Sequence, residues 1–494
     1  MDNSYMPITE LCNPFLIRTC ALIGGEWCES DSKKYFPVIN PATGELLTNV
    51  ADAGVEEARR AIVAAAQAQS NWMQKPVQER SRLLHAWHAL VLKHSDDLAL
   101  ILTLEQGKPL TEARAEIAYG ASYIEWFAEE AKRIYGDIIA PQHPDQRIMV
   151  IKQPVGVVAA ITPWNFPNAM LARKLAPALA AGCAVVAKPA AETPLSALAL
   201  AWLAEEAGIP AGVINIVPST DASAIGIEFS SNKLVRKLSF TGSTRVGKIL
   251  IQQCAEDVKR ITLELGGNAP FIVFEDADLD AAVAGAMASK FRNAGQTCVC
   301  ANRFYIHRNI QSVFCAKLIQ AMQSLTIGNG VASETKIGPL ISRSAVKKVQ
   351  SLVDDALKKG ARITYQADLD KTLLAIGSYY PPTVLNNIAD DSLLLTQEIF
   401  GPVVAILPFD SDEEVAKLAN DTDYGLAAYC FTRDSKRIKK MSEILATGML
   451  GINTGTISNA MAPFGGVKHS GWGREGSHYG IADYLEIKYI CEQI

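Results

Sequence analysis

The sequence predicts an α/β protein built around a parallel, doubly wound sheet. Between Gln153 and Pro270, helix-like segments alternate with four apolar runs, at 155–161, 183–187, 213–217 and 234–240. Strands and helices that alternate in this way form parallel sheets with helices on both faces. A second series begins at Phe271–Phe274 and continues in a small-residue helix over 279–291. Because 494 residues exceed what one hydrophobic core fills, we expect two or three domains.

Two helices of the first series have recognisable starts. Thr193 as N-cap, Pro194 in the first turn and Gly208 just past the end predict a helix over 194–207. The segment Thr241–Thr244 opens another helix, and its free backbone N–H groups would face a phosphate. It lacks the G-x-G-x-x-G pattern, so taken alone it fits an ordinary helix start better than a cofactor loop.

The flanking segments predict helices and an arm. Residues 55–110 show an Ala-rich and charged periodicity that is typical of helices. The stretch 137–152 contains Pro141 and Pro144 and then alternates apolar and polar residues, which predicts a hairpin arm. Residues 484–490 form another β-rich segment.

Composition excludes several classes of function. Hydrophobic residues make up 49%, charged residues 20%, and the net charge is −5, which is ordinary for a soluble globular protein. There is no basic run or mixed aromatic and basic patch, so we expect no nucleic-acid partner. No apolar run approaches the roughly 18 residues needed to span a bilayer. Asp2 and the absence of a basic leader region predict a cytoplasmic protein without a membrane partner.

The ten cysteines are scattered without framework spacing, which predicts reduced thiols. Cys183 and Cys430 lie in apolar runs and are expected in the core. Cys298 and Cys300 form the one close pair, but a second ligand pair is missing and the seven histidines form no cluster. We therefore predict no metal site.

Cys298 is the candidate nucleophile. It lies in the polar segment 291–301, directly after an apolar helical run. A cysteine attacks as its thiolate, and N–H donors or cations lower the thiol pKa. Arg292 and the turn at Gly295 are the expected source of such a field. A lone cysteine is more often a small core residue, so the assignment needs partners.

Two upstream residues are candidate partners. Asn165 follows a buried strand in the segment 157–167, where its amide N–H can meet a developing oxyanion. Glu264 ends an apolar run before a Gly-Gly turn and lies between Leu263 and Leu265. Its expected desolvation would raise its pKa toward that of a general base. The alternatives are a turn-capping Asn165 and a Glu264 that pairs with a surface cation.

These segments, together with further motifs, resemble the NAD(P)-dependent aldehyde dehydrogenase superfamily. The resemblance extends from about residue 23 to the C-terminus, and within the superfamily the segments 291–300 and 473–489 look most like succinate-semialdehyde dehydrogenase. The other matching motifs are Lys188–Pro194, Phe240–Gly247, Glu398–Pro402 and Pro463–Gly471.

The resemblance implies an aldehyde dehydrogenase-like fold. A Rossmann-type dinucleotide-binding domain would comprise residues 11–136 and 153–263, and an α/β catalytic domain would comprise 264–472. The segments 137–152 and 473–494 would form a small β oligomerisation arm. In the family such arms pair between subunits, which predicts a homodimer or homotetramer.

The resemblance also implies the chemistry. Cys298 attacks the aldehyde carbonyl, and the Asn165 amide and the Cys298 backbone N–H hold the oxyanion of the thiohemiacetal. NAD(P) oxidises this adduct to a thioester, which water activated by Glu264 then hydrolyses. The implied cofactor contacts are Lys188 on the adenosine ribose, Ser243 on the pyrophosphate, Trp164 and Phe400 on the rings, and Glu398 on the nicotinamide ribose. Thr162, Pro163, Ala191 and Gly242 complete the predicted cofactor site.

Cofactor choice rests on Ala191. NAD-preferring members of the family commonly place a carboxylate at this position, three residues after the equivalent of Lys188. Its absence removes a repulsion against a 2′-phosphate, so we predict NADP, with NAD as the alternative. Glu192 is expected to point away from Ala191, unless a local twist returns its carboxylate to the ribose.

Substrate choice rests on Arg173, Arg292 and Ser458, which match family positions that hold the distal carboxylate of a semialdehyde. Two guanidinium forks would bind that carboxylate bidentately. The resemblance implies succinic semialdehyde, with glutarate semialdehyde or a broader range of aldehydes as the alternative. For Arg173, which precedes Lys174, the alternative is a solvated helix face.

Cys300 has two interpretations. It is either an inert packing residue or the residue that resolves an oxidised Cys298 into a disulfide. Other classes fit less well. A cysteine hydrolase lacks a histidine base, since His307 lies on a predicted strand, and a CoA-acylating or phosphate-dependent relative would not need Glu264. An inactive structural or ligand-binding relative would be free to lose Cys298, Asn165 or Glu264, and all three are present.

Overall fold

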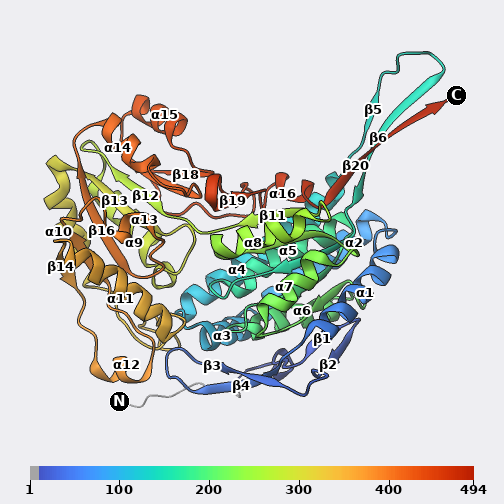
Figure 1. The fold of residues 1–494 in the computed structure, drawn as a ribbon, viewed down its shortest axis with the longest axis horizontal. Helices are drawn as coiled ribbons and strands as arrows, with labels where there is room; N and C mark the ends of the chain where they lie inside the picture. Colours follow the sequence, from blue (N-terminus) through green and yellow to red (C-terminus); the bar gives the residue numbers. More distant parts are fainter. Residues whose placement is uncertain (1–10) are drawn as a thin grey trace.

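The computed structural model describes residues 11–494, and the expectation based on Asp2 lies outside them. Two large sheets form the body, and a narrow arm projects from it (Figure 1). Within the described part of the chain, no helix is both long and apolar enough to cross a bilayer.

The first large sheet has eight strands, and its five central strands are parallel. In spatial order the strands are β19 (Gly471–Trp472), β11 (Arg260–Glu264), β10 (Val235–Thr241), β7 (Val157–Ile161), β8 (Ala184–Lys188), β9 (Ile214–Ile216), β1 (Ala21–Ile23) and β2 (Glu26–Cys28). The chain proceeds from β7 outward to β9 and then returns to place β10 and β11 on the other side of β7. The strand order therefore reverses between β7 and β10, where open α/β sheets bind ligands.

Helices cover both faces of this sheet, which confirms the predicted double winding. One face carries α1 (Val55–Trp72), α7 (Ala222–Ser231) and α8 (Thr244–Ala255). The other carries α2 (Val77–Lys93), α3 (Ser95–Gln106), α4 (Leu110–Glu130), α5 (Pro167–Ala181) and α6 (Pro194–Glu206). Strand residues alternate between the two cores, so Val157 faces the first group and Val158 the second.

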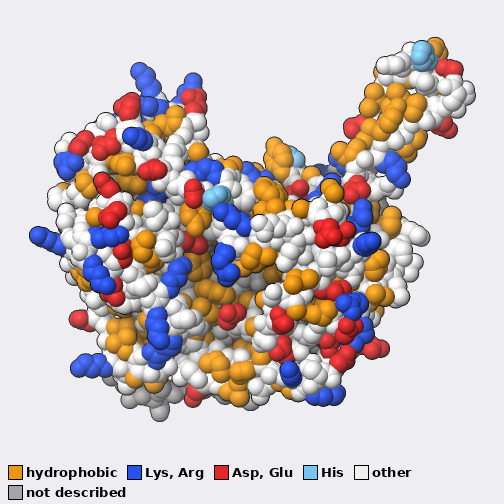
Figure 2. Space-filling model, viewed as in Figure 1, with side chains coloured by type: hydrophobic (Ala, Val, Ile, Leu, Met, Phe, Trp, Pro, Cys, Tyr) orange, Lys and Arg blue, Asp and Glu red, His pale blue; other side chains and the backbone are white. Residues whose placement is uncertain are grey.

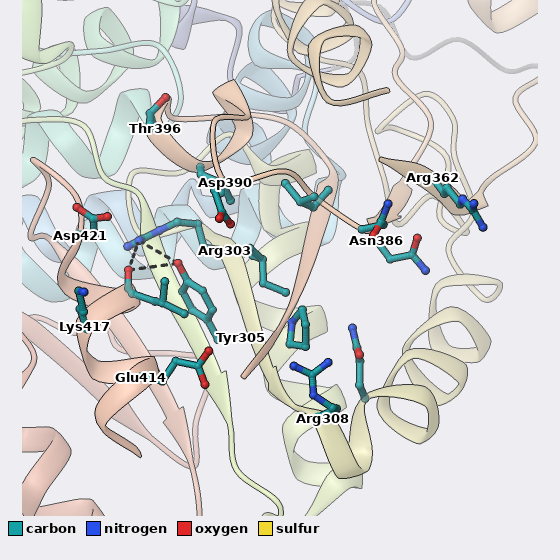
Figure 3. A pocket seen from close by; sticks show the side chains of 17 residues that line it. Arg303, Tyr305, Arg308, Arg362, Asn386, Asp390, Thr396, Glu414, Lys417 and Asp421 are labelled. Atoms are coloured by element: carbon teal, nitrogen blue, oxygen red, sulfur yellow. Dashed lines mark hydrogen bonds between the residues drawn. The ribbon is translucent and has the colours of Figure 1, made fainter. Parts of the chain in front are cut away.

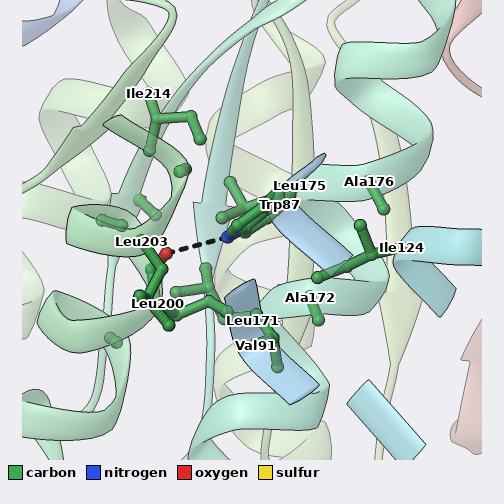
Figure 4. Close-up of a cluster of buried hydrophobic side chains, with 14 of the residues drawn as sticks. Trp87, Val91, Ile124, Leu171, Ala172, Leu175, Ala176, Leu200, Leu203 and Ile214 are labelled. Atoms are coloured by element: carbon green, nitrogen blue, oxygen red, sulfur yellow. Dashed lines mark hydrogen bonds between the residues drawn. The ribbon is translucent and has the colours of Figure 1, made fainter. Parts of the chain in front are cut away.

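Trp87 of α2 lies among the buried side chains of the second group of helices (Figure 4). It belongs to one buried cluster with Leu171, Leu175 and Leu203, and its indole N–H donates to the Leu200 carbonyl at 3.1 Å. The buried polar atom is thus satisfied, as a tryptophan in a core requires.

The second large sheet has seven strands, all parallel except the edge strand β14. In order they are β14 (Arg362–Gln366), β15 (Thr383–Asn386), β16 (Val403–Phe409), β13 (Ala301–His307), β12 (Ala269–Val273), β17 (Ala427–Phe431) and β18 (Met449–Ile452). The helix α9 (Leu279–Phe291) has the bounds that the sequence predicts. The remaining helices are α10 (Gln311–Met322), α11 (Arg343–Lys358), α12 (Lys371–Ile376), α13 (Leu393–Thr396), α14 (Asp412–Asn420), α15 (Ser435–Ile444) and α16 (Tyr479–Ala482). A small ribbon pairs β3 (Tyr35–Ile39) with β4 (Leu46–Ala51).

The arm is an antiparallel sheet of β5 (Asp137–Ile139), β6 (Gln146–Pro154) and β20 (Leu485–Gln493), and both segments predicted for it contribute. Hydrophobic side chains lie along its surface (Figure 2), and Ile138 and Ile487 are 87% and 73% exposed. Residues 473–484 of the predicted segment do not belong to this sheet, because its pairing begins at Leu485. The division into domains by residue number remains a proposal.

Thr193 is the N-cap residue of α6, as predicted, but Glu105 supplies the hydrogen bonds that cap the helix. The Thr193 hydroxyl makes no capping bond. Instead, the Glu105 carboxyl at the end of α3 accepts the N–H groups of Leu195 and Ser196, each at 2.8 Å. A carboxyl group offers two acceptor oxygens at the positive end of the helix, whereas a hydroxyl offers one. Cys183 and Cys430 are fully buried, as predicted.

The crossing of α4 over α5 generates a stability prediction. A Cβ atom added to Gly120 would overlap the Asn168 side chain and lie 3.3 Å from the Ala169 Cα. We expect Gly120→Ala to lower the free energy of unfolding by about 1–3 kcal/mol through overpacking. Gly226 in α7 is the matched control, because an added Cβ would meet only Leu250, at 3.8 Å.

Gly226→Ala should instead raise the stability by about 0.5–1 kcal/mol, since alanine is the better helix former. Urea unfolding midpoints of both variants and the wild type check this difference. A Gly120→Ala protein more stable than wild type would contradict the packing.

Candidate active site

The candidate site lies where the two large sheets face each other. The segment 162–166 follows β7 and Gly242 follows β10, so both flank the point at which the strand order reverses. Glu264 is the last residue of β11, and its main-chain carbonyl accepts the Gly242 N–H at 3.0 Å. Cys298 lies in the loop between α9 and β13, which leads into the second sheet.

A left-handed turn shapes the loop that carries Cys298. Asn293, Ala294 and Gly295 have φ angles of 51°, 54° and 79°. Non-glycine residues seldom adopt this conformation, so two consecutive examples indicate a turn held by its surroundings. The turn leaves the Cys298 side chain partly exposed, whereas residues 293–297 are buried.

Asn165 connects this loop to the first sheet. Its side-chain amide is buried and donates to the Gln296 carbonyl at 3.1 Å. An amide nitrogen carries two N–H groups, so one donor remains for an oxyanion. The turn-capping alternative does not describe this residue, because its amide reaches across to the other sheet.

Glu264 is buried, with 4% of its surface exposed, and Oε2 has no hydrogen-bond partner within residues 11–494. The backbone at Gly465 lies directly against the carboxyl, since an added Cβ there would be 2.8 Å from Oε1. Burial raises the pKa of Glu264 well above its usual value, and Glu475 raises it further. The expected desolvation is therefore present, and the alternative of a surface ion pair is wrong.

Sequence reasoning missed Glu475. Its carboxylate accepts hydrogen bonds from Arg173 on one oxygen and from Lys174 at 2.7 Å on the other. Although burial alone would raise the pKa of Glu475, these two cations lower it to about 2. The partners lie about 300 residues apart in the chain, so no local pattern announces the contact.

The expectation that the pKa of the Cys298 thiol is lowered is wrong for the structure described. Burial raises the pKa of the thiol to about 12, and Glu398 and Glu264 also raise it. Arg173 and Arg292 lower it, as cations should, but desolvation of the thiolate is the larger effect. The nucleophile is therefore held as a thiol, and its proton must leave before attack.

The predicted cofactor residues lie in loops beside the strands, Trp164 and Ser243 after β7 and β10, and Glu398 and Phe400 before β16. Trp164 and Phe400 meet edge to face with ring centres 5.5 Å apart. Ser243 is the N-cap of α8, and its hydroxyl accepts the Val246 N–H at 3.4 Å. Glu398 accepts the Gly267 N–H at 3.1 Å, and burial raises its pKa to about 7.

Lys188 ends β8, and its neighbours bear on cofactor choice. The side chain is buried and donates to the Pro189 carbonyl at 3.1 Å. Burial lowers the pKa of Lys188, and the carboxylates of Glu192, Asp52 and Asp221 oppose that shift. The charge of Glu192 therefore acts on Lys188, although the side chain is exposed and Ala191 is half-buried.

The arginines predicted for the substrate occupy different settings. Arg173 is buried rather than on a solvated face, and Nε and Nη2 are bonded to Glu475. Only Nη1 has no partner within residues 11–494, so a second bidentate fork is not available there. Arg292 lies over the Phe166 ring at 4.6 Å and makes no hydrogen bond to other described residues. Ser458 is half-buried, in the loop after β18.

Cys300 is buried, and its thiol lies 3.7 Å from the Lys290 carbonyl oxygen. Both Cys298 and Cys300 are free thiols. Packing accounts for Cys300 as the structure stands, and its role as a resolving cysteine remains a prediction.

A separate cavity of about 970 Å³ lies on the second sheet, and none of its lining residues belongs to the predicted site (Figure 3). Arg303 at its wall donates to the carbonyls of Asn268, Leu418 and Ala419. These main-chain contacts give Arg303 a structural role.

Comparisons with known proteins agree with this geometry. The model of the aldehyde dehydrogenase family matches residues 27–490. The chain is 54% identical to a 3-sulfolactaldehyde dehydrogenase of Pseudomonas putida, over 98% of each chain. It is also 54% identical to a Pseudomonas putida glutarate-semialdehyde dehydrogenase and to an NADP(+) succinate-semialdehyde dehydrogenase of Escherichia coli, over 96% of this chain and 98% of each relative.

A crystal structure of succinate-semialdehyde dehydrogenase from Burkholderia pseudomallei superposes with a TM-score of 0.96 at 55% identity, covering 98% of this chain and all of that one. The chain belongs to the aldehyde dehydrogenase family. It is an NAD(P)-dependent oxidoreductase that acts on a small-molecule aldehyde.

Proposed function

We propose that the protein oxidises succinic semialdehyde to succinate, with glutarate semialdehyde as the alternative substrate. The observation that carries the proposal is the placement of two guanidinium groups, with Arg292 over the Phe166 ring next to Asn165 and Arg173 buried against Glu475. The aldehydes named for the relatives each carry an acidic group, and a cation beside the reacting carbon favours such substrates.

Arg292 is the primary contact in this proposal. Its guanidinium makes no ion pair with other residues of 11–494 and rests on the Phe166 ring, so its donors face an incoming carboxylate. Arg173 adds the two N–H groups of its unpartnered Nη1 and a positive charge, while Glu475 holds its plane in place. Ser458 would supply a further hydrogen bond from the loop after β18.

The chemical steps follow from the chain's own groups. The Cys298 thiol loses its proton to solvent and its sulfur bonds the aldehyde carbon. The C=O π pair moves onto oxygen, where the free N–H of Asn165 and the Cys298 backbone N–H hold the anion. After oxidation to a thioester, Glu264 takes a proton from water, and the hydroxide attacks the thioester carbon. The C–S bond breaks, the Cys298 sulfur leaves with the electron pair, and the acid is released. Its raised pKa makes Glu264 a stronger base than an ordinary carboxylate.

The cofactor residues suit a nicotinamide dinucleotide. The hydroxyl of Thr162 is buried without a partner in the described chain, and the backbone N–H groups at the start of α8 are available to a pyrophosphate. Lys188 would hold the adenosine ribose, Trp164 and Phe400 the rings, and Glu398 the nicotinamide ribose. When bound, the cofactor supplies the oxidant for the aldehyde carbon.

The first prediction tests the role of Arg292. Arg292→Ala should lower kcat/KM for succinic semialdehyde. The loss should correspond to a rise of about 2–5 kcal/mol in activation free energy, because a charge-assisted pair with the substrate is lost. Activity on uncharged butanal should change far less. Arg308→Ala, which removes an exposed arginine paired with Asp410, is the control and should leave both values unchanged. Equal losses on the two aldehydes would show that Arg292 shapes the loop instead of recognising the carboxylate.

The second prediction concerns the cofactor. We propose NADP, because Ala191 offers no carboxylate to repel a 2′-phosphate and Lys188 supplies a countercharge. Ala191→Glu should shift the ratio of kcat/KM values toward NAD. Because Glu192 acts on Lys188, Glu192→Gln should shift the ratio further toward NADP.

Steady-state kinetics with both cofactors check these shifts. A wild-type protein that prefers NAD, together with an Ala191→Glu variant of unchanged preference, would remove position 191 as the selector.

We also infer that the arm joins identical chains into a homodimer or homotetramer in the cytoplasm. Ile138, Ile487 and Tyr489 expose large apolar surfaces on a sheet that projects from the body. Apolar surface of this kind on an edge is typical of a subunit contact.

A further inference from the structure

The oxyanion donor and the nucleophile loop meet on two main-chain carbonyls. The Asn165 carbonyl accepts the Lys108 ammonium at 2.8 Å and the Asn293 side-chain amide at 3.0 Å. The Gln296 carbonyl accepts the Asn165 amide at 3.1 Å and the Asn293 amide at 3.2 Å. The segments that carry the two reacting groups are thus bonded to each other before any substrate arrives.

Lys108, just before α4, and Glu116, within α4, hold the Asn165 side of this junction. The Lys108 ammonium forms a fully buried ion pair with Glu116 and lies 3.8 Å from the centre of the Phe166 ring. Glu116 in turn accepts the N–H groups of Asn168 and Ala169 at the first turn of α5. These contacts fix the Asn165 side of the junction.

Glu112, one turn before Glu116 on the same helix, reaches the other side. Its carboxylate accepts the backbone N–H of Asn293 at 2.7 Å, across 181 residues of chain. Asn293 is the first of the three left-handed residues that turn the chain toward Cys298. The charge of Arg292 also acts on Glu112, together with that of Lys108.

We propose that Glu112 is a positioning residue, which holds the left-handed turn at Asn293 so that Cys298 and Arg292 keep their places opposite Asn165. The turn is costly for Asn293 and Ala294, and the hydrogen bond from its first N–H to Glu112 offsets that cost. Glu112 is half-buried, so it contacts the loop but does not belong to the buried face of α4.

This inference rests on the proposed role of Cys298, and its first test needs no substrate. In Glu112→Ala, hydrogen exchange of the peptide spanning 292–300 should accelerate by roughly 10- to 100-fold, because the protected Asn293 N–H loses its acceptor. Glu125→Ala is the matched control, since Glu125 is exposed on the same helix. It should leave exchange in this peptide unchanged.

The second readout is catalytic. Glu112→Ala should lower kcat for succinic semialdehyde and for butanal by similar factors, since a displaced Cys298 slows attack on any aldehyde. Glu112→Gln keeps an acceptor oxygen and should recover most of the rate. Glu112→Asp keeps the charge but is one methylene too short, so it should resemble Glu112→Ala in both measurements.

Unchanged exchange at 292–300 in both Glu112→Ala and Glu112→Asp would overturn the proposal. A Glu112→Gln protein as impaired as Glu112→Ala would also overturn it, because charge and not the hydrogen bond would then matter. If the exchange result holds while succinic semialdehyde proves a poor substrate, the positioning role stands and the proposed substrate fails.

Discussion

The hydrogen bonds between the Asn165 and Gln296 segments are the constraint on which the candidate site depends. Asn165 follows β7 of the first sheet, and Gln296 lies in the loop before β13 of the second. An oxyanion donor is effective only when it is aimed before the charge develops. The structure meets this requirement by hydrogen-bonding the donor segment directly to the nucleophile loop. Lys108 and the Asn293 side chain both donate to the Asn165 main-chain carbonyl.

Burial of charge is the second theme of the molecule. Arg173, Lys174, Glu264 and Glu475 lie within one buried cluster, and each carboxylate behaves differently because its partners differ. Glu475 has two bonded cations and stays ionised, whereas Glu264 has an unpaired oxygen and a raised pKa. Two carboxyl groups with opposite shifts in one site are typical of a division between a structural anion and a base.

Much of the fold follows from local pattern. The four apolar runs predicted β7, β8, β9 and β10, and α9 has the expected bounds, because strand and helix periodicities are local properties. The motifs around Asn165, Glu264 and Cys298 likewise predicted which loops would carry chemistry. The N-cap residue Thr193 was predicted, but the hydrogen bonds that cap α6 were not, because Glu105 reaches them from a helix about 90 residues earlier.

The same limit applies to the site. Glu475 and Glu112 make their decisive contacts with Arg173 and Asn293, far away in the chain, and no spacing rule connects these pairs. The thiol pKa is a further example. The sequence indicated nearby cations, and Arg173 and Arg292 do lower the pKa of Cys298. Only the packed structure shows that desolvation outweighs them.

The central claim is that Cys298 carries the acyl group and Glu264 releases it. The most direct measurement is the intact and peptide mass of Glu264→Gln after one turnover with cofactor and succinic semialdehyde. The account predicts an adduct with the mass of a succinyl thioester on Cys298, which accumulates because no base activates water for its hydrolysis. An unmodified Cys298 in a variant that still binds both ligands would contradict it, because Glu264 would then act before the thioester forms.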